Sequence, residues 1–236
     1  MANCLSILLS EPATRPAAAS DRLRWLRRVT RATPPAALAG RLIRWRCRPG
    51  DLLAVTGSPE ARRPAILDAI ANAVTAVRGG EAAVLRVERI GLHADAAPID
   101  HLHLPRGRAR QALIAAGLDC AWQQVSPVAA LGEAERWQLR LAVALAATAA
   151  RPHTVLLLAR RWCHDLDAVS ARRLCRRVRR MVRDGGLLLA VETARRELLA
   201  ALRPTVHLRL CGAALRIAGA GARRFTCQTS ATERGA

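Results

Sequence analysis

Residues 52–70 read LLAVTGSPEARRPAILDAI, and this stretch decides the fold that the sequence predicts. Residues 52–56 form an apolar run of the length of a buried strand, and Gly57 then opens a turn. A helix is expected from about Pro64 to Val77, because proline is well placed in a first helical turn. The stretch therefore predicts a strand, a tight turn and an amphipathic helix.

The turn carries part of a phosphate-binding pattern, G-x-x-x-x-G-K-[ST]. In that pattern the glycines let backbone N–H groups wrap phosphates, the lysine reaches the outer phosphates and the hydroxyl binds magnesium. Here Gly57 is kept, whereas the positions of the second glycine, the lysine and the hydroxyl hold Arg62, Arg63 and Pro64. The match is too partial to assign a function on its own.

Length and composition indicate one principal folded domain. The chain has 236 residues, enough for one sizeable core, and its 51% hydrophobic content favours a globule. We find no basic region of a signal peptide at the N-terminus, and the longest largely apolar run, residues 141–150, is too short to span a bilayer. We therefore expect a cytoplasmic protein without a transmembrane segment.

Cysteine and histidine spacing predicts no metal site. The seven cysteines are scattered and never form a C-x-x-C pair, which argues against a disulfide framework and a zinc module. His101 and His103 form a His-x-His pair near His93, but no further ligand stands at a suitable spacing. We expect these histidines to be structural or exposed to solvent.

The net charge of +20 comes from arginine, because the sequence contains no lysine. Such a charge raises nucleic acid or an acidic membrane as a partner, and arginine suits phosphate through its bidentate fork. An arginine-only, alanine-rich composition is also what a very GC-rich coding sequence yields, so a merely solvated surface explains the charge equally well. The candidate binding surfaces are two basic helices, at residues 22–31 and 168–183.

Strands and helices are predicted to alternate along the chain. After a strand at 42–48 and a turn at 49–51, the strand at 52–56 completes a hairpin-like pair. Further strands are expected at 82–87, 154–159, 187–191 and 206–210, and further helices at 108–118, 128–150, 168–183 and 197–202. This alternation predicts an α/β fold with a largely parallel sheet.

With this order of elements, residues 38–212 resemble the nucleotide-binding domain of an ATP-binding cassette (ABC) ATPase. Residues 131–146, LGEAERWQLRLAVALA, align without a gap with the LSGGQ-type signature of that family and the helix after it. The phosphate-contacting positions of the signature are taken by Gly132, Glu133, Ala134 and Glu135.

Two later landmarks follow at the intervals of the family. The apolar strand that should end in Asp-Glu is followed by Arg160 and Arg161, and residues 162–167, WCHDLD, keep the D-loop aspartate as Asp167. The next strand leads to Glu192, without the switch histidine of the family. The ordered landmarks match, whereas the residues that carry the chemistry differ.

The resemblance implies a P-loop NTPase-like α/β fold, with a mostly parallel sheet flanked by helices and a helical insert that carries the signature region. Outside residues 38–212 we expect a basic N-terminal extension with a short helix over residues 1–37 and a flexible tail over residues 213–236.

The changed residues argue against metal-dependent hydrolysis. Phosphoryl transfer in the family rests on magnesium at the phosphates, a carboxylate that positions water and a partner signature that closes over the γ-phosphate. Arg160 and Arg161 put cations where the family has acids, so Mg²⁺ would be repelled and no catalytic residue remains. Glu133 and Glu135 would face phosphate with like charge. We expect hydrolysis to be absent or weak.

Several interpretations stay open at the level of the sequence. A metal-free site for ATP or another phosphate ligand could form at the carboxyl edge of the sheet from Arg62, Arg63, Arg160 and Arg161. The leading hypothesis is a pseudo-ATPase in a homodimer or beside an active cassette partner, with Asp167 at the dimer seam as the resemblance implies. The alternatives are a nucleic-acid-binding or scaffold module, a decaying gene product, and an active ABC ATPase with an atypical site.

Overall fold

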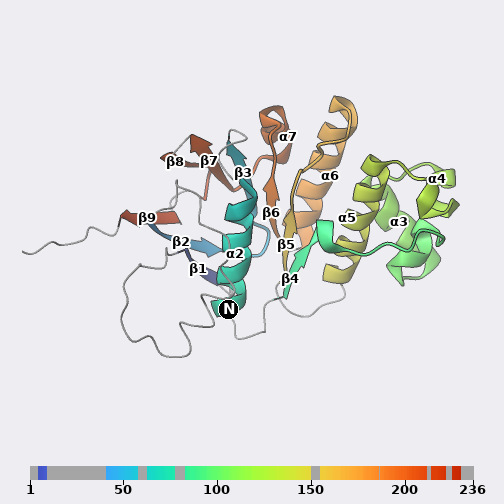
Figure 1. Cartoon of the computed structure of the whole chain (residues 1–236), viewed down its shortest axis with the longest axis horizontal. Helices are drawn as coiled ribbons and strands as arrows, with labels where there is room; N and C mark the ends of the chain where they lie inside the picture. Colours follow the sequence, from blue (N-terminus) through green and yellow to red (C-terminus); the bar gives the residue numbers. More distant parts are fainter. Residues whose placement is uncertain are drawn as a thin grey trace, which may run out of the picture.

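The computed structural model describes residues 5–9, 41–57, 63–77, 83–149, 155–185, 187–211, 214–221 and 225–229. Its centre is a six-stranded sheet in the order β4-β5-β6-β3-β7-β8 (Figure 1). The strands are β3 (Leu52–Gly57), β4 (Ala83–Arg86), β5 (Val155–Ala159), β6 (Leu188–Glu192), β7 (Val206–Cys211) and β8 (Ala214–Ala218). All neighbouring pairs are parallel except β7 with β8, so the predicted parallel α/β sheet is confirmed.

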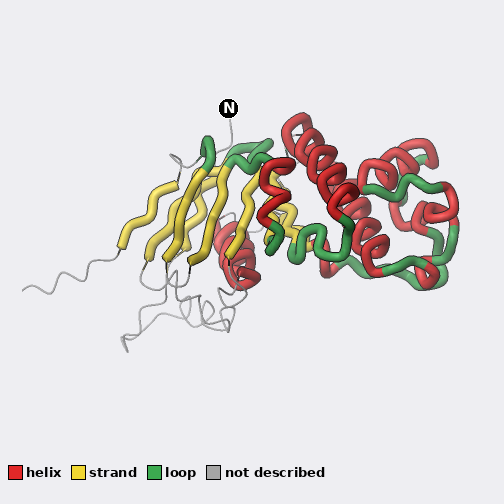
Figure 2. The backbone as a smooth tube through the Cα atoms, turned by 90° about the horizontal axis from the view of Figure 1, so that it is seen from above, coloured by secondary structure: helices red, strands yellow, loops and turns green. Residues whose placement is uncertain are grey.

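Helices cover both faces of this sheet (Figure 2). The helix after β3, α2 (Arg63–Val77), packs on one face with Leu53 and Val55. The neighbouring residues Leu52 and Ala54 point to the other face, where they pack with α5 (Glu133–Ala149), α6 (Ala168–Gly185) and α7 (Leu199–Leu202). A strand covered on both sides must be apolar throughout, and this is why residues 52–56 show no polar alternation.

A helical insert lies between β4 and β5 and has its own apolar core. It comprises η3 (Val87–Arg89), η4 (Pro98–Leu102), α3 (Arg106–Ala116), α4 (Ala121–Val125), η5 (Val128–Ala130) and α5. The single helix predicted for residues 128–150 is wrong at its start. The backbone is extended at Leu131, with ψ 144°, and a new helix begins at Glu133.

A second sheet corrects the predicted hairpin. β2 (Arg41–Cys47) pairs antiparallel with β1 (Leu5–Leu9) on one side and β9 (Phe225–Thr229) on the other, and it does not share a sheet with β3. The turn between β2 and β3 is closed by the Asp51 carboxylate, whose Oδ2 accepts the Arg48 N–H at 2.7 Å. Alternation of polar and apolar residues identifies a half-buried strand but does not name its partner.

Residues 213–236, predicted as a flexible tail, contain two strands, at residues 214–218 and 225–229. In β8 the residues Leu215 and Ile217 pack against the core on the α2 side of the sheet. β1 likewise lies within residues 1–37, where the sequence predicted only a short helix. That helix, at residues 22–31, falls outside the described residues.

Candidate functional site

The start of α2 lies at the carboxyl end of β3, where the sequence predicts a phosphate site. Gly57 ends the strand and Arg63 and Pro64 begin the helix, whereas Arg62 falls outside the described residues. The first N–H groups of a helix have no partner within the helix, and they point at this edge of the sheet. Together with the helix dipole they favour an anion here.

A carboxylate of the protein itself stands at this place. Glu192, the last residue of β6, forms an ion pair with Arg63, with Oε1 at 2.9 Å from Nε and side-chain exposures of 5% and 14%. Its Oε2 accepts the backbone N–H of Arg161 at 3.0 Å. Arg63 also donates from Nη1 to the Gly57 carbonyl at 2.8 Å. The guanidinium predicted as an anion ligand is therefore neutralised inside the fold.

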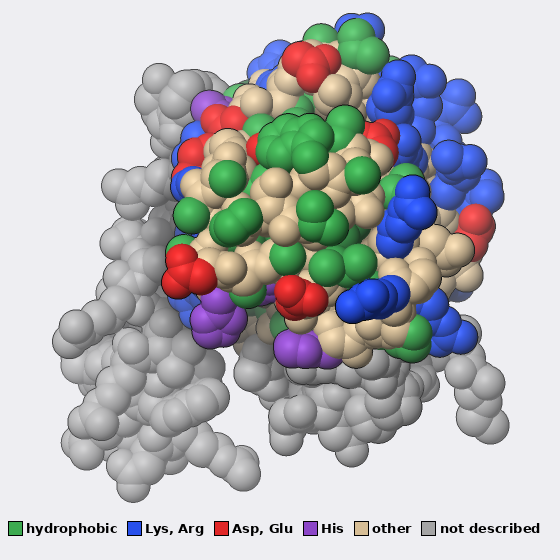
Figure 3. All heavy atoms as spheres, turned by 90° about the vertical axis from the view of Figure 1, so that its right-hand side faces the viewer, with side chains coloured by type: hydrophobic (Ala, Val, Ile, Leu, Met, Phe, Trp, Pro, Cys, Tyr) green, Lys and Arg blue, Asp and Glu red, His purple; other side chains and the backbone are tan. Residues whose placement is uncertain are grey.

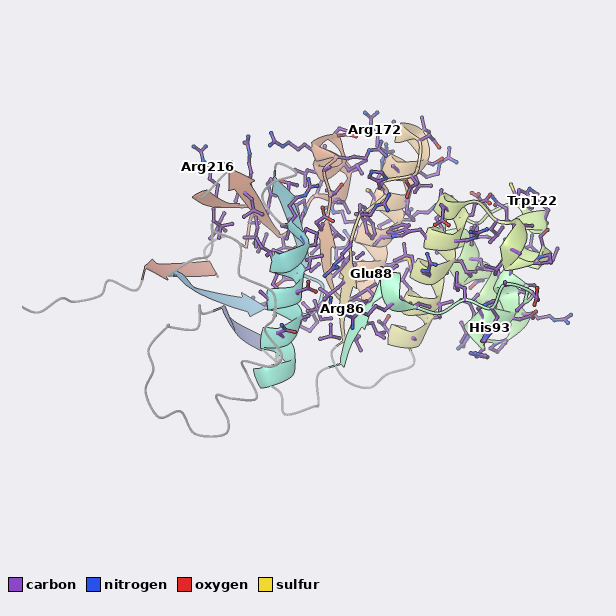
Figure 4. All side chains as sticks on the ribbon, viewed as in Figure 1. Arg86, Glu88, His93, Trp122, Arg172 and Arg216 are labelled. Atoms are coloured by element: carbon purple, nitrogen blue, oxygen red, sulfur yellow. The ribbon has the colours of Figure 1, made fainter. Side chains whose placement is uncertain are left out.

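Arg160, which follows β5, is also held by carboxylates. Its Nη2 bonds Asp68 of α2, and its Nε lies 3.4 Å from Glu88 without hydrogen-bond geometry. Asp68 accepts a second hydrogen bond from Arg86, the last residue of β4. Figure 4 shows Arg86 and Glu88 on the segment that ends β4 and begins the insert. This network joins α2 to the edge of the sheet.

Arg161 is exposed and contacts side chains of its own turn. Its side chain is 65% exposed and reaches His164 Nδ1 at 3.0 Å and Asp165 Oδ1 at 3.5 Å. Its backbone has a φ of +49°, which an L residue rarely adopts. Each of the described arginines of the predicted anion crevice, Arg63, Arg160 and Arg161, therefore contacts groups of the chain itself, and their joint binding of an anion stays a prediction.

The residues at the end of β5 do not fit a magnesium ion. Mg²⁺ prefers carboxylate oxygens, and the two residues that follow β5 are arginines. Among the described residues, no cluster of at least three His, Cys, Asp or Glu side chains could hold a metal ion. Glu192 accepts from Arg63 and Arg161, so both of its oxygens are already engaged.

The four signature-equivalent residues form the start of α5. Glu135 accepts the Gly132 N–H with Oε2 at 2.9 Å and the Gln123 amide with Oε1 at 2.6 Å. Glu133 forms an ion pair with Arg136 at 3.0 Å. A glutamate at the third helical position that bonds the N-cap N–H is half of a capping box. Here too a carboxylate of the chain occupies a helix start.

Asp167 caps the third helix of the site. Its Oδ1 accepts the N–H groups of Val169 at 2.9 Å and Ser170 at 3.0 Å. A hydrogen bond from the Ser170 side chain, and then these backbone bonds, lower the pKa of the Asp167 carboxyl. The preceding turn is held by Arg195, whose Nη1 donates to the carbonyls of Cys163 and Leu166 at 2.9 and 2.6 Å. The Asp167 side chain is exposed to solvent.

No role was predicted for Glu192 from the sequence, where it marks only the end of a strand that lacks the switch histidine of the family. The available signal was a charged residue directly after the buried run at 187–191. Glutamate is almost never buried without a partner, so its position predicts a cation nearby. That argument would have named Glu192 but not Arg63.

Among the histidines of the insert, His101 is structural, whereas the side chains of His93 and His103 are exposed. The His101 ring lies 2.9 Å from the His93 N–H at Nε2 and 3.0 Å from the Ala97 carbonyl oxygen at Nδ1.

The length and apolar content of the described helices decide whether one of them could span a membrane. No helix within the part of the chain that the structure describes is both long and apolar enough to cross a bilayer.

Comparisons with solved structures identify the fold. The dimeric MJ0796, a bacterial ABC transporter cassette, matches with a TM-score of 0.59 and 13% identity over 75% of this chain and 88% of its own. Its dimeric post-hydrolysis state bound to ADP and Pi matches with 0.57 and 14% over the same shares. A metal-chelate-type ABC transporter in an inward-facing conformation matches with 0.54 and 15%, over 76% of this chain and 75% of its own.

No protein-family model matches the chain, and no curated protein does. At identities of 13–15% the likeness concerns the fold alone. The chain therefore has the P-loop NTPase-like fold of the ATP-binding cassettes of ABC transporters, and the resemblance stated from the sequence is confirmed at that level.

Proposed function

We propose that this chain is a degenerate ABC-type nucleotide-binding domain, a pseudo-ATPase that does not hydrolyse ATP through magnesium. The observation that carries the proposal is the buried ion pair between Arg63 and Glu192 at the start of α2. A phosphate at a helix start needs free N–H groups and an available cation. Here the cation is engaged, and the carboxylate beside it would repel an incoming phosphate.

Loss of catalysis follows from the same contacts. The reaction needs a metal at the phosphates and a carboxylate that positions water. Arg160 and Arg161 occupy the strand end where a metal ligand would stand, and Glu192 is the only acidic residue within β5 and β6 and the two residues after each. Because Glu192 is held by Arg63 and the Arg161 N–H, it is not free to act as a base.

The start of α5 supports the same reading. In the family that this chain resembles, the signature of a partner cassette closes over the phosphate. In this chain Glu133 and Glu135 stand at the signature positions. A second copy that approached in this way would bring carboxylates toward the nucleotide. We therefore infer that the chain acts as a regulatory or structural half, in a homodimer or beside an active cassette, with Asp167 near the seam. The neighbour MJ0796, described as dimeric, supports an assembly of two cassettes.

The proposed location is the cytoplasm. The cysteines that the structure describes, Cys47, Cys120, Cys163, Cys175 and Cys211, are not joined in disulfides. Reduced cysteines accord with a reducing compartment.

Nucleotide binding is the property that tests the proposal. We expect the wild type to bind ATP weakly in calorimetry, with the same affinity whether or not magnesium is present. Glu192→Gln should bind ATP roughly tenfold more tightly, since the repelling charge is removed and Arg63 is freed. The matched control is Glu197→Gln, the same substitution at an exposed residue that pairs with Arg195.

Two outcomes would overturn the proposal. The first is magnesium-dependent ATP hydrolysis by the wild type that Glu192→Gln abolishes, which would make Glu192 the catalytic carboxylate of an atypical but active ATPase. The second is ATP binding that neither glutamate substitution changes, which would place the nucleotide away from the Arg63–Glu192 pair. If neither the wild type nor Glu192→Gln binds ATP, only a scaffold role remains for the chain.

A further inference from the structure

The outer face of α6 is made almost entirely of arginine. Leu174, Cys175, Val178 and Val182 are buried against the core. At 3.6 residues per turn, an arc of roughly 120° on the opposite side holds six arginines. They are Arg172, Arg173, Arg176, Arg179, Arg180 and Arg183. We call this arc the α6 arginine face.

Most of this face has no carboxylate partner. Arg183 pairs with its neighbour Asp184, with Nε at 2.8 Å from Oδ1. Within the described residues, no Asp or Glu lies at ion-pair distance from the other five members of the face. Arg177, just outside the arc, turns toward α3 and donates to the Ile114 carbonyl at 2.6 Å. Asp184 and Glu197 act on Arg180 and Arg172 only at longer range, so the face carries a concentrated positive charge that the fold compensates only in part.

The lower part of the face is hollowed. A cavity of about 390 Å³ is lined by Arg176, Arg179, Arg180 and Arg183. Figure 3 shows Arg side chains gathered along one edge of the molecule. Figure 4 shows Arg172 projecting outward at the upper end of α6. Arginine side chains around such a hollow can hold phosphates bidentately.

We propose that the α6 arginine face binds the phosphate backbone of double-stranded nucleic acid. Arg172 and Arg183 are separated along the helix by about 17 Å, at 1.5 Å per residue. A duplex displays one phosphate charge per about 1.7 Å of its axis, so this length faces about ten charges. Contacts to phosphates carry no sequence information, so the proposed binding is independent of sequence.

A membrane surface fits this face less well. A helix that lies on a bilayer buries an apolar face among the lipids. The apolar face of α6 is already buried in the protein core, and its exposed apolar residue is Val169, in the first turn. Only charge is left to hold a partner, which suits a linear polyanion. Because α6 shares no residue with the Arg63–Glu192 pair, this proposal stands or falls apart from the proposed function.

The test measures binding of the full chain to a short, fluorescently labelled DNA duplex at several salt concentrations. The variant combines Arg176→Gln, Arg179→Gln and Arg180→Gln, since glutamine keeps helix propensity. The matched control combines Arg106→Gln, Arg108→Gln and Arg110→Gln, which remove the same charge from exposed residues of α3.

The α6 triple variant should lose about tenfold to hundredfold in affinity. Its slope of log K against log salt should fall by roughly three, because each lost phosphate contact contributes about 0.9. The control should change affinity and slope much less. The triple Arg→Lys variant at the same α6 positions should retain most of the affinity, which also guards against loss through misfolding.

Several results would overturn the proposal. One is an equal loss in both Gln variants, which would mean that total charge decides the binding. Another is the absence of duplex binding by the wild type at low salt. A third is tighter binding to phosphatidylserine vesicles than to the duplex, with the same dependence on the α6 arginines, which would make a membrane the partner.

Discussion

Arginines at the carboxyl edge of the sheet and arginines on α6 differ in whether a carboxylate of the chain pairs with them. Arg63 and Arg160 each reach a carboxylate that the fold supplies, namely Glu192 and Asp68. On the α6 arginine face only Arg183 has such a partner among the described residues. The difference teaches that arginine content alone does not locate an anion site. What matters is whether the protein has already neutralised the charge.

Burial explains why the two regions differ. A charge removed from water must be paired, because an unpaired buried charge costs several kcal/mol, of the order of 3–5. Arg63 is 14% exposed and therefore requires Glu192. The guanidinium groups on α6 remain in water, where no partner is needed. Solvated arginines are the ones that stay available to a ligand.

The largest expected effect comes from Arg63→Ala. It leaves Glu192 buried without its cation and should lower the free energy of unfolding by about 3–5 kcal/mol in urea denaturation. Arg176→Ala, on the exposed face of α6, should change it by no more than about 0.5 kcal/mol. Similar costs for the two substitutions would erase the distinction between paired and unpaired arginines. Replacing both partners, Arg63→Met with Glu192→Leu, should recover much of the loss.

An intermediate effect is expected from Asp68→Asn. The substitution removes a carboxylate that Arg86 and Arg160 share, at side-chain exposures between 13% and 30%. Because water screens the cluster in part, the cost should be about 1–2 kcal/mol in the same denaturation experiment. Asp165→Asn is the matched control in an exposed pair with Arg161. An equal cost for both would mean that the Asp68 network adds nothing to a surface ion pair.

The smallest effect concerns pH. Burial and then the nearby charges of Arg209 and Arg196 lower the pKa of His207 below its ordinary 6.5. His207 Nε2 lies 2.7 Å from the buried Thr56 Oγ1. Below pH 6.5 the His207 imidazole takes up a proton in the unfolded chain, whereas in the folded chain it does so only at lower pH. The free energy of unfolding should therefore fall as the pH is lowered from 6.5, and His207 should leave it unchanged above pH 6.5.

His207→Gln isolates this contribution in urea denaturation at several pH values. The substitution should flatten that part of the pH profile, because glutamine does not titrate. An unchanged slope in the variant would assign the effect to other groups. A wild type that gains stability on acidification would contradict the sign of the shift.

The sequence predicts the central sheet well because its strands are buried on both faces. Runs such as residues 154–159 and 187–191 leave few alternatives to a parallel strand. The second sheet escaped prediction, since β1 and β9 are short and flank β2 from distant parts of the chain. Local patterns carry no information about such pairings.

The sequence predicted on which elements the arginines of the candidate site lie, but not which carboxylates pair with them. The motif spacing placed Arg63 at the helix start and Arg160 at the strand end, as the structure has them. It did not reveal that Glu192 and Asp68 neutralise them, because these contacts join residues of different elements.

The pairing of β2 bears on how the chain is made. One neighbour, β1, precedes it in the sequence, whereas β9 follows every other described strand. During synthesis β2 therefore leaves the ribosome with one neighbour already made and waits for the other until residues 225–229 emerge. Throughout that interval one edge of β2 presents unpaired backbone groups. Until β9 is made, this edge is open to chaperones and to aggregation.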